Sequence, residues 1–150
     1  MHNQPEQNLG EFHQQFRGAF YGILKWDQLD TLWKVVDAKA DDGWYIYVPG
    51  EAPPQQPASA EHVKTFITEI NQLLRKEHQE DYCGVVYVDN KDAPTFIKIY
   101  DPNNMGVVCG FSDNPPLPGW VLSQTRPEYL DSNTFNTKSR RRWWKKIFSS

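Results

Sequence analysis

The stretch that most constrains the fold is residues 81–123, where three short runs rich in β-branched and aromatic residues are separated by turns. The runs are Cys83–Val88, Thr95–Tyr100 and Gly106–Phe111. The two gaps between them are rich in Asn, Asp and Pro. These residues favour tight turns, because Asn and Asp side chains hydrogen-bond the local backbone and Pro fixes φ. The pattern predicts a β-meander at the centre of the fold.

Apolar residues recur at helical spacing in three segments that precede the meander. The first runs from Leu9 to Leu24, and the second follows it over residues 26–36. The third has the clearest apolar stripe and extends from about Ala60 to His78, with Ser59 placed to cap its first turn. These segments predict two N-terminal helices and one long amphipathic helix that lies across a sheet.

Two further runs predict strands outside the meander. Residues 44–48 are aromatic and β-branched and end at a Pro-Gly turn, and residues 120–122 can form a short return strand. The sequence therefore predicts a single α+β domain over residues 9–123, with a mainly antiparallel sheet of about four or five strands. We expect a loose N-terminus over residues 1–8 and a polar linker over residues 124–139.

Charge divides the chain into two parts. All 19 acidic residues and 10 of the 16 basic residues lie in residues 1–131, whereas residues 132–150 carry six basic residues and no acidic one. An acidic body would repel phosphates, so the charge pattern argues against nucleic acid as the partner. A basic segment attached to an acidic body indicates that the segment has a role of its own.

No targeting signal is evident in the chain. It opens with polar residues, and no apolar run reaches the ~18–20 residues that a bilayer span requires. We therefore expect a cytoplasmic protein in which Cys83 and Cys109 are reduced thiols.

Few residues suggest catalysis or cofactor binding. Gly-rich phosphate loops and paired-histidine zinc helices are absent from the sequence, and we expect no cofactor. His78, Cys83 and Cys109 could meet at one end of the sheet as soft metal ligands, or a cysteine could act as a nucleophile. The alternative is that both cysteines are small core residues. The segment Pro115–Pro118 can serve either as a proline-rich ligand or as a stiff loop.

The C-terminal tail, residues 140–150, carries the clearest functional pattern. On a helical projection of residues 141–148 the apolar side chains gather on one arc and the basic side chains cover the rest, while Arg140 projects onto the apolar side but lies at the end and can snorkel. The candidate binding residues are Arg141, Arg142, Trp143, Trp144, Lys145, Lys146, Ile147 and Phe148. Trp and Phe opposite Lys and Arg are typical of a helix that lies in a membrane interface.

Residues 140–148 resemble the short C-terminal membrane-targeting helices of bacterial cell-division and division-site proteins. The resemblance implies an anionic membrane surface as a partner of the tail. The tail could instead dock on a protein partner or on the acidic body. A homodimer is also open, since two tails would bind a membrane more tightly than one.

The sequence thus leaves two functions to compare. The first is a non-enzymatic adaptor or regulatory protein that binds a protein partner and is recruited to an anionic membrane by its tail. The alternative is a small enzyme or metal-site protein that uses Cys83, Cys109 or His78.

Overall fold

The structure is a computed structural model that describes residues 10–77, 81–102 and 117–130. Its elements follow in the order α1 (Glu11–Phe16), β1 (Tyr21–Ile23), α2 (Trp26–Ala38), β2 (Tyr45–Tyr47), α3 (Ala60–Glu77), β3 (Val86–Val88), β4 (Phe96–Ile99) and β5 (Trp120–Ser123). The strands form one antiparallel sheet in the order β1-β3-β4-β5-β2. The predicted α+β class and the mainly antiparallel sheet are confirmed.

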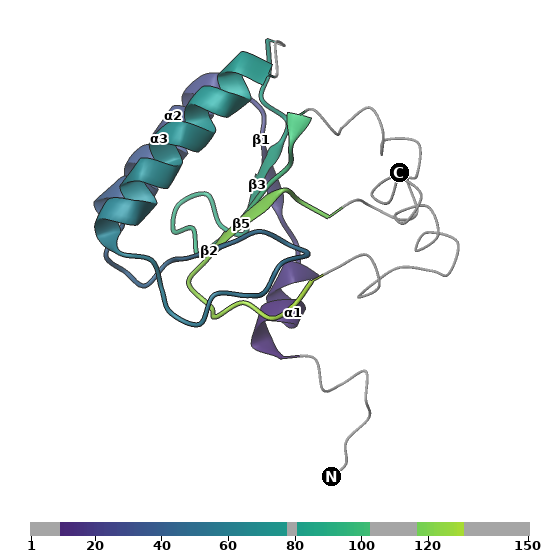
Figure 1. Cartoon of the computed structure of the whole chain (residues 1–150). Coiled ribbons are helices and arrows are strands. Elements are labelled where there is room, and N and C mark those ends of the chain that lie inside the picture. Colours follow the sequence, from purple (N-terminus) through teal and green to yellow (C-terminus); the bar gives the residue numbers. More distant parts are fainter. Residues whose placement is uncertain (1–9, 78–80, 103–116, 131–150) are drawn as a thin grey trace, which may run out of the picture.

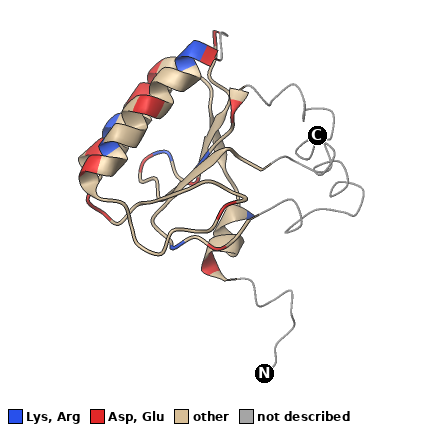
Figure 2. Cartoon of the chain, viewed as in Figure 1, with Lys and Arg blue, Asp and Glu red and all other residues tan. Residues whose placement is uncertain are grey.

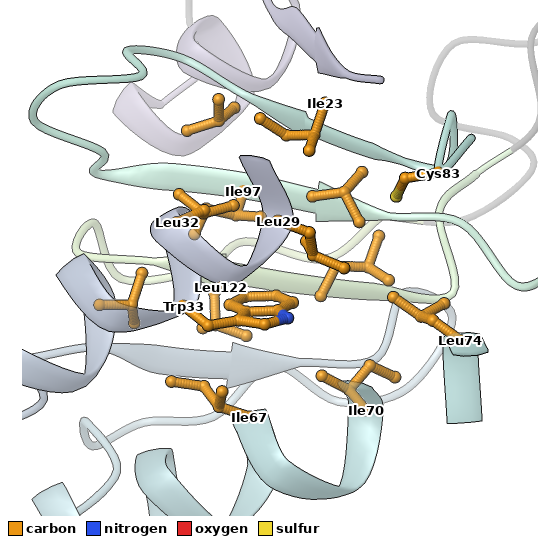
Figure 3. Close-up of a cluster of buried hydrophobic side chains, with 14 of the residues drawn as sticks. Ile23, Leu29, Leu32, Trp33, Ile67, Ile70, Leu74, Cys83, Ile97 and Leu122 are labelled. Atoms are coloured by element: carbon orange, nitrogen blue, oxygen red, sulfur yellow. The ribbon is translucent and has the colours of Figure 1, made fainter. Parts of the chain in front are cut away.

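Helices α2 and α3 lie side by side over one face of the sheet (Figure 1). Their apolar stripes meet sheet residues such as Ile97 and Leu122 in the larger of two buried clusters (Figure 3). Trp33 of α2 is buried there, and its indole N–H donates to Asn71 Oδ1 of α3 at 3.2 Å. The indole thus gains a polar partner while its ring fills the space between the helices and the sheet.

Helix α3 agrees closely with the predicted long helix. Its first turn is capped by Ser59, whose Oγ accepts from His62 N at 3.1 Å. Near its C-terminal end Arg75 pairs with Asp30 of α2 at 2.6 Å, and its guanidinium lies 4.9 Å from the Trp26 ring centroid. These contacts fix α3 beside α2, although the exposed ion pair contributes little on its own.

The meander is present, with one change in its strands. In register, β4 pairs with β3 through Ile97–Val88 and with β5 through Ile97–Leu122. Both sides of β4 are therefore occupied, and β5 takes the place that the sequence suggested for the run Gly106–Phe111. That run lies outside the described residues. The predicted strand at residues 44–48 is confirmed as β2, which forms one edge of the sheet.

The predicted continuous helix from Leu9 to Leu24 is wrong over its second half. Helix α1 ends at Phe16, and Tyr21–Ile23 form the edge strand β1 instead. Strand pairing with β3 is favoured over a continued helix here. Tyr21 and Ile23 have high strand propensity, and the backbone of β1 forms antiparallel hydrogen bonds with β3. Gly22 fits beneath the Tyr87 ring, where an added Cβ would lie 3.3 Å from a ring carbon.

The other face of the sheet carries a second, smaller core made largely of aromatic rings. Its buried members are Phe12, Phe16, Tyr47, Phe96, Val121 and Leu130. The Phe12 and Phe96 ring centroids are 5.1 Å apart, and Phe20 meets Phe96 edge-on at 5.5 Å. Helix α1 thus packs on the sheet face opposite α2 and α3.

The packed chain continues beyond the predicted domain boundary at residue 123. Leu130 is fully buried, its N–H donates to the Tyr47 hydroxyl at 2.8 Å, and its carbonyl accepts from Gly50 N at 2.6 Å. The first part of the predicted polar linker, residues 124–130, therefore belongs to the fold. The remainder of that linker, residues 131–139, is outside the described part of the chain.

Candidate functional site

The predicted binding residues of the tail, Arg141 to Phe148, lie outside the described residues. Leu130 is the last described residue, and it is held between Tyr47 and Gly50. Ten residues, 131–140, separate it from Arg141. The chain therefore leaves the described fold toward the tail on the side of the sheet that carries α1 and the second core.

Hydrogen bonds from His13 hold the segment just before Leu130. The His13 ring lies between two acceptors, with Nδ1 3.0 Å from Glu128 Oε1 and Nε2 3.0 Å from the Tyr129 carbonyl oxygen. The neutral ring can donate to only one of them, whereas the protonated ring can donate to both. Glu128 also accepts from His13 N at 3.3 Å. Helix α1 and residues 128–130 are therefore joined by several polar contacts in addition to the ring packing.

Cys83 behaves as a core residue. It is fully buried among the side chains of the larger core, and burial raises the pKa of its thiol. A thiol in this state is a poor nucleophile and a poor metal ligand, since both roles use the thiolate. Within residues 10–77, 81–102 and 117–130 there is no cluster of three or more His, Cys, Asp or Glu side chains arranged for a metal ion. Cys109 and His78, the other candidate residues, are not described.

Lys98 was not predicted from the sequence as a candidate site residue, but it has an unusual environment. It lies on β4, the middle strand, and its ammonium group is 4.1 Å from the Phe16 ring centroid and 4.0 Å from the Phe20 ring centroid. Burial lowers the pKa of this lysine from 10.5 to about 8. A signal was present in the sequence: one lysine interrupts the otherwise apolar strand Phe96–Ile99.

Two tyrosines lie near Lys98 in the sheet, and one of them, Tyr100, packs against the larger core. Tyr87 of β3 is its register partner, and Tyr100 follows it by two residues along β4. The two tyrosine rings meet edge-on at 5.7 Å. Burial, with a smaller contribution from Tyr87, raises the pKa of Tyr100 to about 12. Lys98 therefore has aromatic and phenolic neighbours, and no described carboxylate forms an ion pair with it.

Three of the exposed large apolar side chains in the described part of the chain lie at the β1 edge of the sheet. Tyr21 and Leu24 on and after β1 are 55% and 61% exposed, and Tyr82, which leads into β3, is 54% exposed. Leu24 and Tyr82 are brought close because Cys83 N donates to the Leu24 carbonyl at 2.7 Å. The opposite edge strand, β2, is flanked by other parts of the chain, since Ala58 N donates to the Trp44 carbonyl just before it. Val48, just after β2, and Tyr129 are also exposed, at 38% and 48%.

The charges on the helices are mixed rather than segregated. Figure 2 shows acidic and basic residues interleaved along α3, whereas α2 carries three Asp and one Lys. The mixed charges of α3 are well suited to water. The described helices are also too short or too polar for any of them to cross a bilayer.

Comparison of the chain with models of protein families, with the sequences of curated proteins and with solved structures gives no significant match.

Proposed function

We propose that this chain is a non-enzymatic adaptor or regulatory protein that residues 140–148 attach to an anionic membrane surface, while its folded domain meets a protein partner. The observation that carries the proposal is the tail itself. It places five basic residues and four large apolar ones in nine positions. Over residues 141–148 the two kinds separate onto opposite arcs of a helix, and only Arg140, at the end, projects onto the apolar side.

The free-energy contributions to membrane binding favour weak, reversible attachment. Each basic residue near an anionic leaflet contributes about 1 kcal/mol. Each of the two Trp, the Ile and the Phe adds about 1.5–3 kcal/mol when it is fully buried. Ordering nine residues opposes this by about 1–2 kcal/mol each. One tail therefore binds marginally, and two tails in a dimer would bind much more tightly through avidity.

The charge of the described domain and the length of residues 131–139 are compatible with this arrangement. The described domain carries more acidic than basic residues, so an anionic surface would repel its body. Residues 131–139 can span at most about 30 Å when fully extended. This length lets the tail contact a bilayer without forcing the acidic body onto it.

The β1 edge supports the second half of the proposal. Tyr21, Leu24 and Tyr82 expose a combination of ring and aliphatic surface that is typical of protein contacts. An enzyme built on Cys83 has less support, because that thiol is buried and its pKa is raised.

Co-sedimentation of the full-length chain with vesicles tests the proposal. Wild type should bind vesicles that contain phosphatidylglycerol and should bind neutral phosphatidylcholine vesicles poorly, with binding that weakens as salt rises. Changing Arg141, Arg142, Lys145 and Lys146 to Gln should abolish most of the binding.

A matched control removes the same charge from the domain. Lys34, Lys39, Lys64 and Lys91 are all exposed, and changing all four to Gln should leave vesicle binding nearly unchanged. Equal loss of binding in the two quadruple variants would show that net charge alone acts, and it would refute a specific role for the tail.

A further inference from the structure

Residues 128–130, here called the strap, pack beside α1 and contribute to the second core. Leu130 is fully buried in that core, and its N–H donates to the Tyr47 hydroxyl of β2 at 2.8 Å. Its carbonyl accepts from Gly50 N at 2.6 Å. Leu130 is also the last described residue before the segment that leads to the tail. Release of the strap would therefore withdraw a buried leucine from the second core and lengthen the connection to the tail.

The Glu128 carboxylate of the strap occupies space that the glycine at position 10 leaves open. A Cβ added to Gly10 would collide with the Glu128 carboxylate, so a larger side chain there would displace it. Gly10 has a φ of −70°, which any residue can adopt, so the close contact and not the backbone conformation requires glycine. Glu128 Oε1 accepts from His13 N in the first turn of α1 at 3.3 Å. The strap thus supplies an acceptor for a helix whose N-cap residue has no side chain.

The His13 ring faces two acceptors of the strap at once. Its Nδ1 lies 3.0 Å from Glu128 Oε1, and its Nε2 lies 3.0 Å from the Tyr129 carbonyl oxygen. In either neutral tautomer one ring nitrogen directs a lone pair at an oxygen, and this contact is repulsive. The imidazolium form donates to both oxygens. The His13 side chain is only 12% exposed, which limits how far water can relieve the repulsion.

Glu128 is the carboxylate that forms an ion pair with His13. The other charged or titratable side chains on the elements packed around the ring are Glu11 and Arg17 of α1, Arg126 before the strap, Tyr47 of β2, Glu51 after β2 and Lys98 of β4. Arg126 donates to Gln55 at 2.8 Å, and Lys98 lies against the Phe16 ring. Glu11 and Arg17 are exposed, so solvent screens their opposite effects on the ring. In model peptides histidine titrates at about pH 6.5 and glutamate at about pH 4.3, so imidazolium and carboxylate coexist between these values.

We propose that His13, Glu128 and the Tyr129 carbonyl form a pH-sensitive latch, which holds the strap firmly when the ring is protonated and loosens it when the ring is neutral. Protonation replaces one repulsive contact by a charge-assisted hydrogen bond, and it places opposite charges on α1 and the strap. Loss of the proton reverses both effects. The latch rests on contacts within the described fold, and it does not depend on the membrane role proposed for the tail.

Amide hydrogen exchange of the full-length protein, followed by NMR at pH 5.5 and pH 7.5, tests the latch. The measured quantities are the protection factors of the Leu130 and Gly50 N–H groups, which correct for the pH dependence of intrinsic exchange. Because a charge-assisted hydrogen bond is roughly twice as strong as a neutral one, we expect both protection factors to fall by roughly tenfold at the higher pH. The Ala58 N–H, which donates to the Trp44 carbonyl at the start of β2, is the internal control and should change by less than about twofold.

Three variants, each checked by circular dichroism, separate the latch from other titrations. His13→Gln removes the titrating ring and Gly10→Ala displaces the Glu128 carboxylate, so in both the pH dependence of Leu130 protection should be lost. His62→Gln is the matched control, since His62 is exposed on α3, and it should keep the fall seen in wild type. The proposal would be overturned by equal protection of Leu130 at the two pH values in wild type, by an equal fall at Ala58, or by an undiminished fall in His13→Gln or Gly10→Ala.

Discussion

Replacement of Lys98 by Met should stabilise the fold and remove a specific part of its pH dependence. Met has a similar length and no charge, so it can fill the same space beside Phe16 and Phe20. Lowering a lysine pKa from 10.5 to about 8 corresponds to about 3 kcal/mol lost to burial of the charged form. The two ring contacts return about 1 kcal/mol each. The variant should therefore be more stable than wild type at pH 7 by about 1–2 kcal/mol.

The sign of the pH dependence follows from the lowered pKa. Below pH 8 the lysine is protonated in both the folded and the unfolded chain, and the folded state carries the whole cost. Between pH 8 and 10.5 the unfolded chain keeps a proton that the folded chain has released, so the stability of wild type rises. From pH 7 to pH 9.5 this gain is about 2 kcal/mol. Tyr100 acts in the opposite direction, but only above pH 10, because its pKa is raised to about 12.

Urea unfolding followed by tryptophan fluorescence at pH 7 and pH 9.5 measures the effect as a difference between wild type and Lys98→Met. The free energy of unfolding of wild type should approach that of the variant as the pH rises. The reasoning would be refuted by a difference between the two proteins that does not change with pH, or by a variant that is less stable than wild type at pH 7.

Three further changes test the packing. Tyr47→Phe removes the hydroxyl that accepts from Leu130 N at 2.8 Å, and it should cost about 1–2 kcal/mol in urea unfolding and speed proteolysis within residues 124–130; unchanged cleavage would show that the segment is held by other contacts. Gly22→Ala places a Cβ 3.3 Å from the Tyr87 ring and should destabilise by about 1 kcal/mol, whereas a neutral result would mean that the ring moves freely aside. In a Cys109→Ser background, Cys83 should react with a disulfide reagent only as fast as the fold opens, because it is fully buried; fast reaction under native conditions would contradict its place in the core.

Much of the fold could be predicted from periodicity and turn chemistry. The stripe of α3 and its Ser59 cap are local signals, and Asp89 fixes the turn between β3 and β4 by accepting from Thr95 N and Phe96 N at 2.9 and 3.0 Å. The prediction of one helix from Leu9 to Leu24 was wrong because Phe12, Phe16 and Phe20 share one core at this spacing whether or not the backbone between them is helical. Pairing with a strand more than sixty residues away decided the outcome at Tyr21, and no local signal carries that information.

Some features of the candidate sites could likewise be predicted from the sequence, and others could not. The burial of Cys83 agrees with the interpretation of the cysteines as small core residues. The role of residues 124–130 was missed, since a polar composition hid one buried leucine that is tied to Tyr47. The environment of Lys98 could not be read from sequence, because the two rings that surround it come from α1 and from the turn before β1.

Tryptophan fluorescence on vesicles is the most direct test of membrane attachment by the tail. The full-length chain is compared with a chain that ends at Lys138, which lacks Trp143 and Trp144 but keeps the four other tryptophans. The account predicts a blue shift on addition of phosphatidylglycerol vesicles that is seen only in the full-length chain and that declines with salt. It would be contradicted if Trp143 and Trp144 already gave a blue-shifted, quencher-protected signal without vesicles and showed no further shift when vesicles were added.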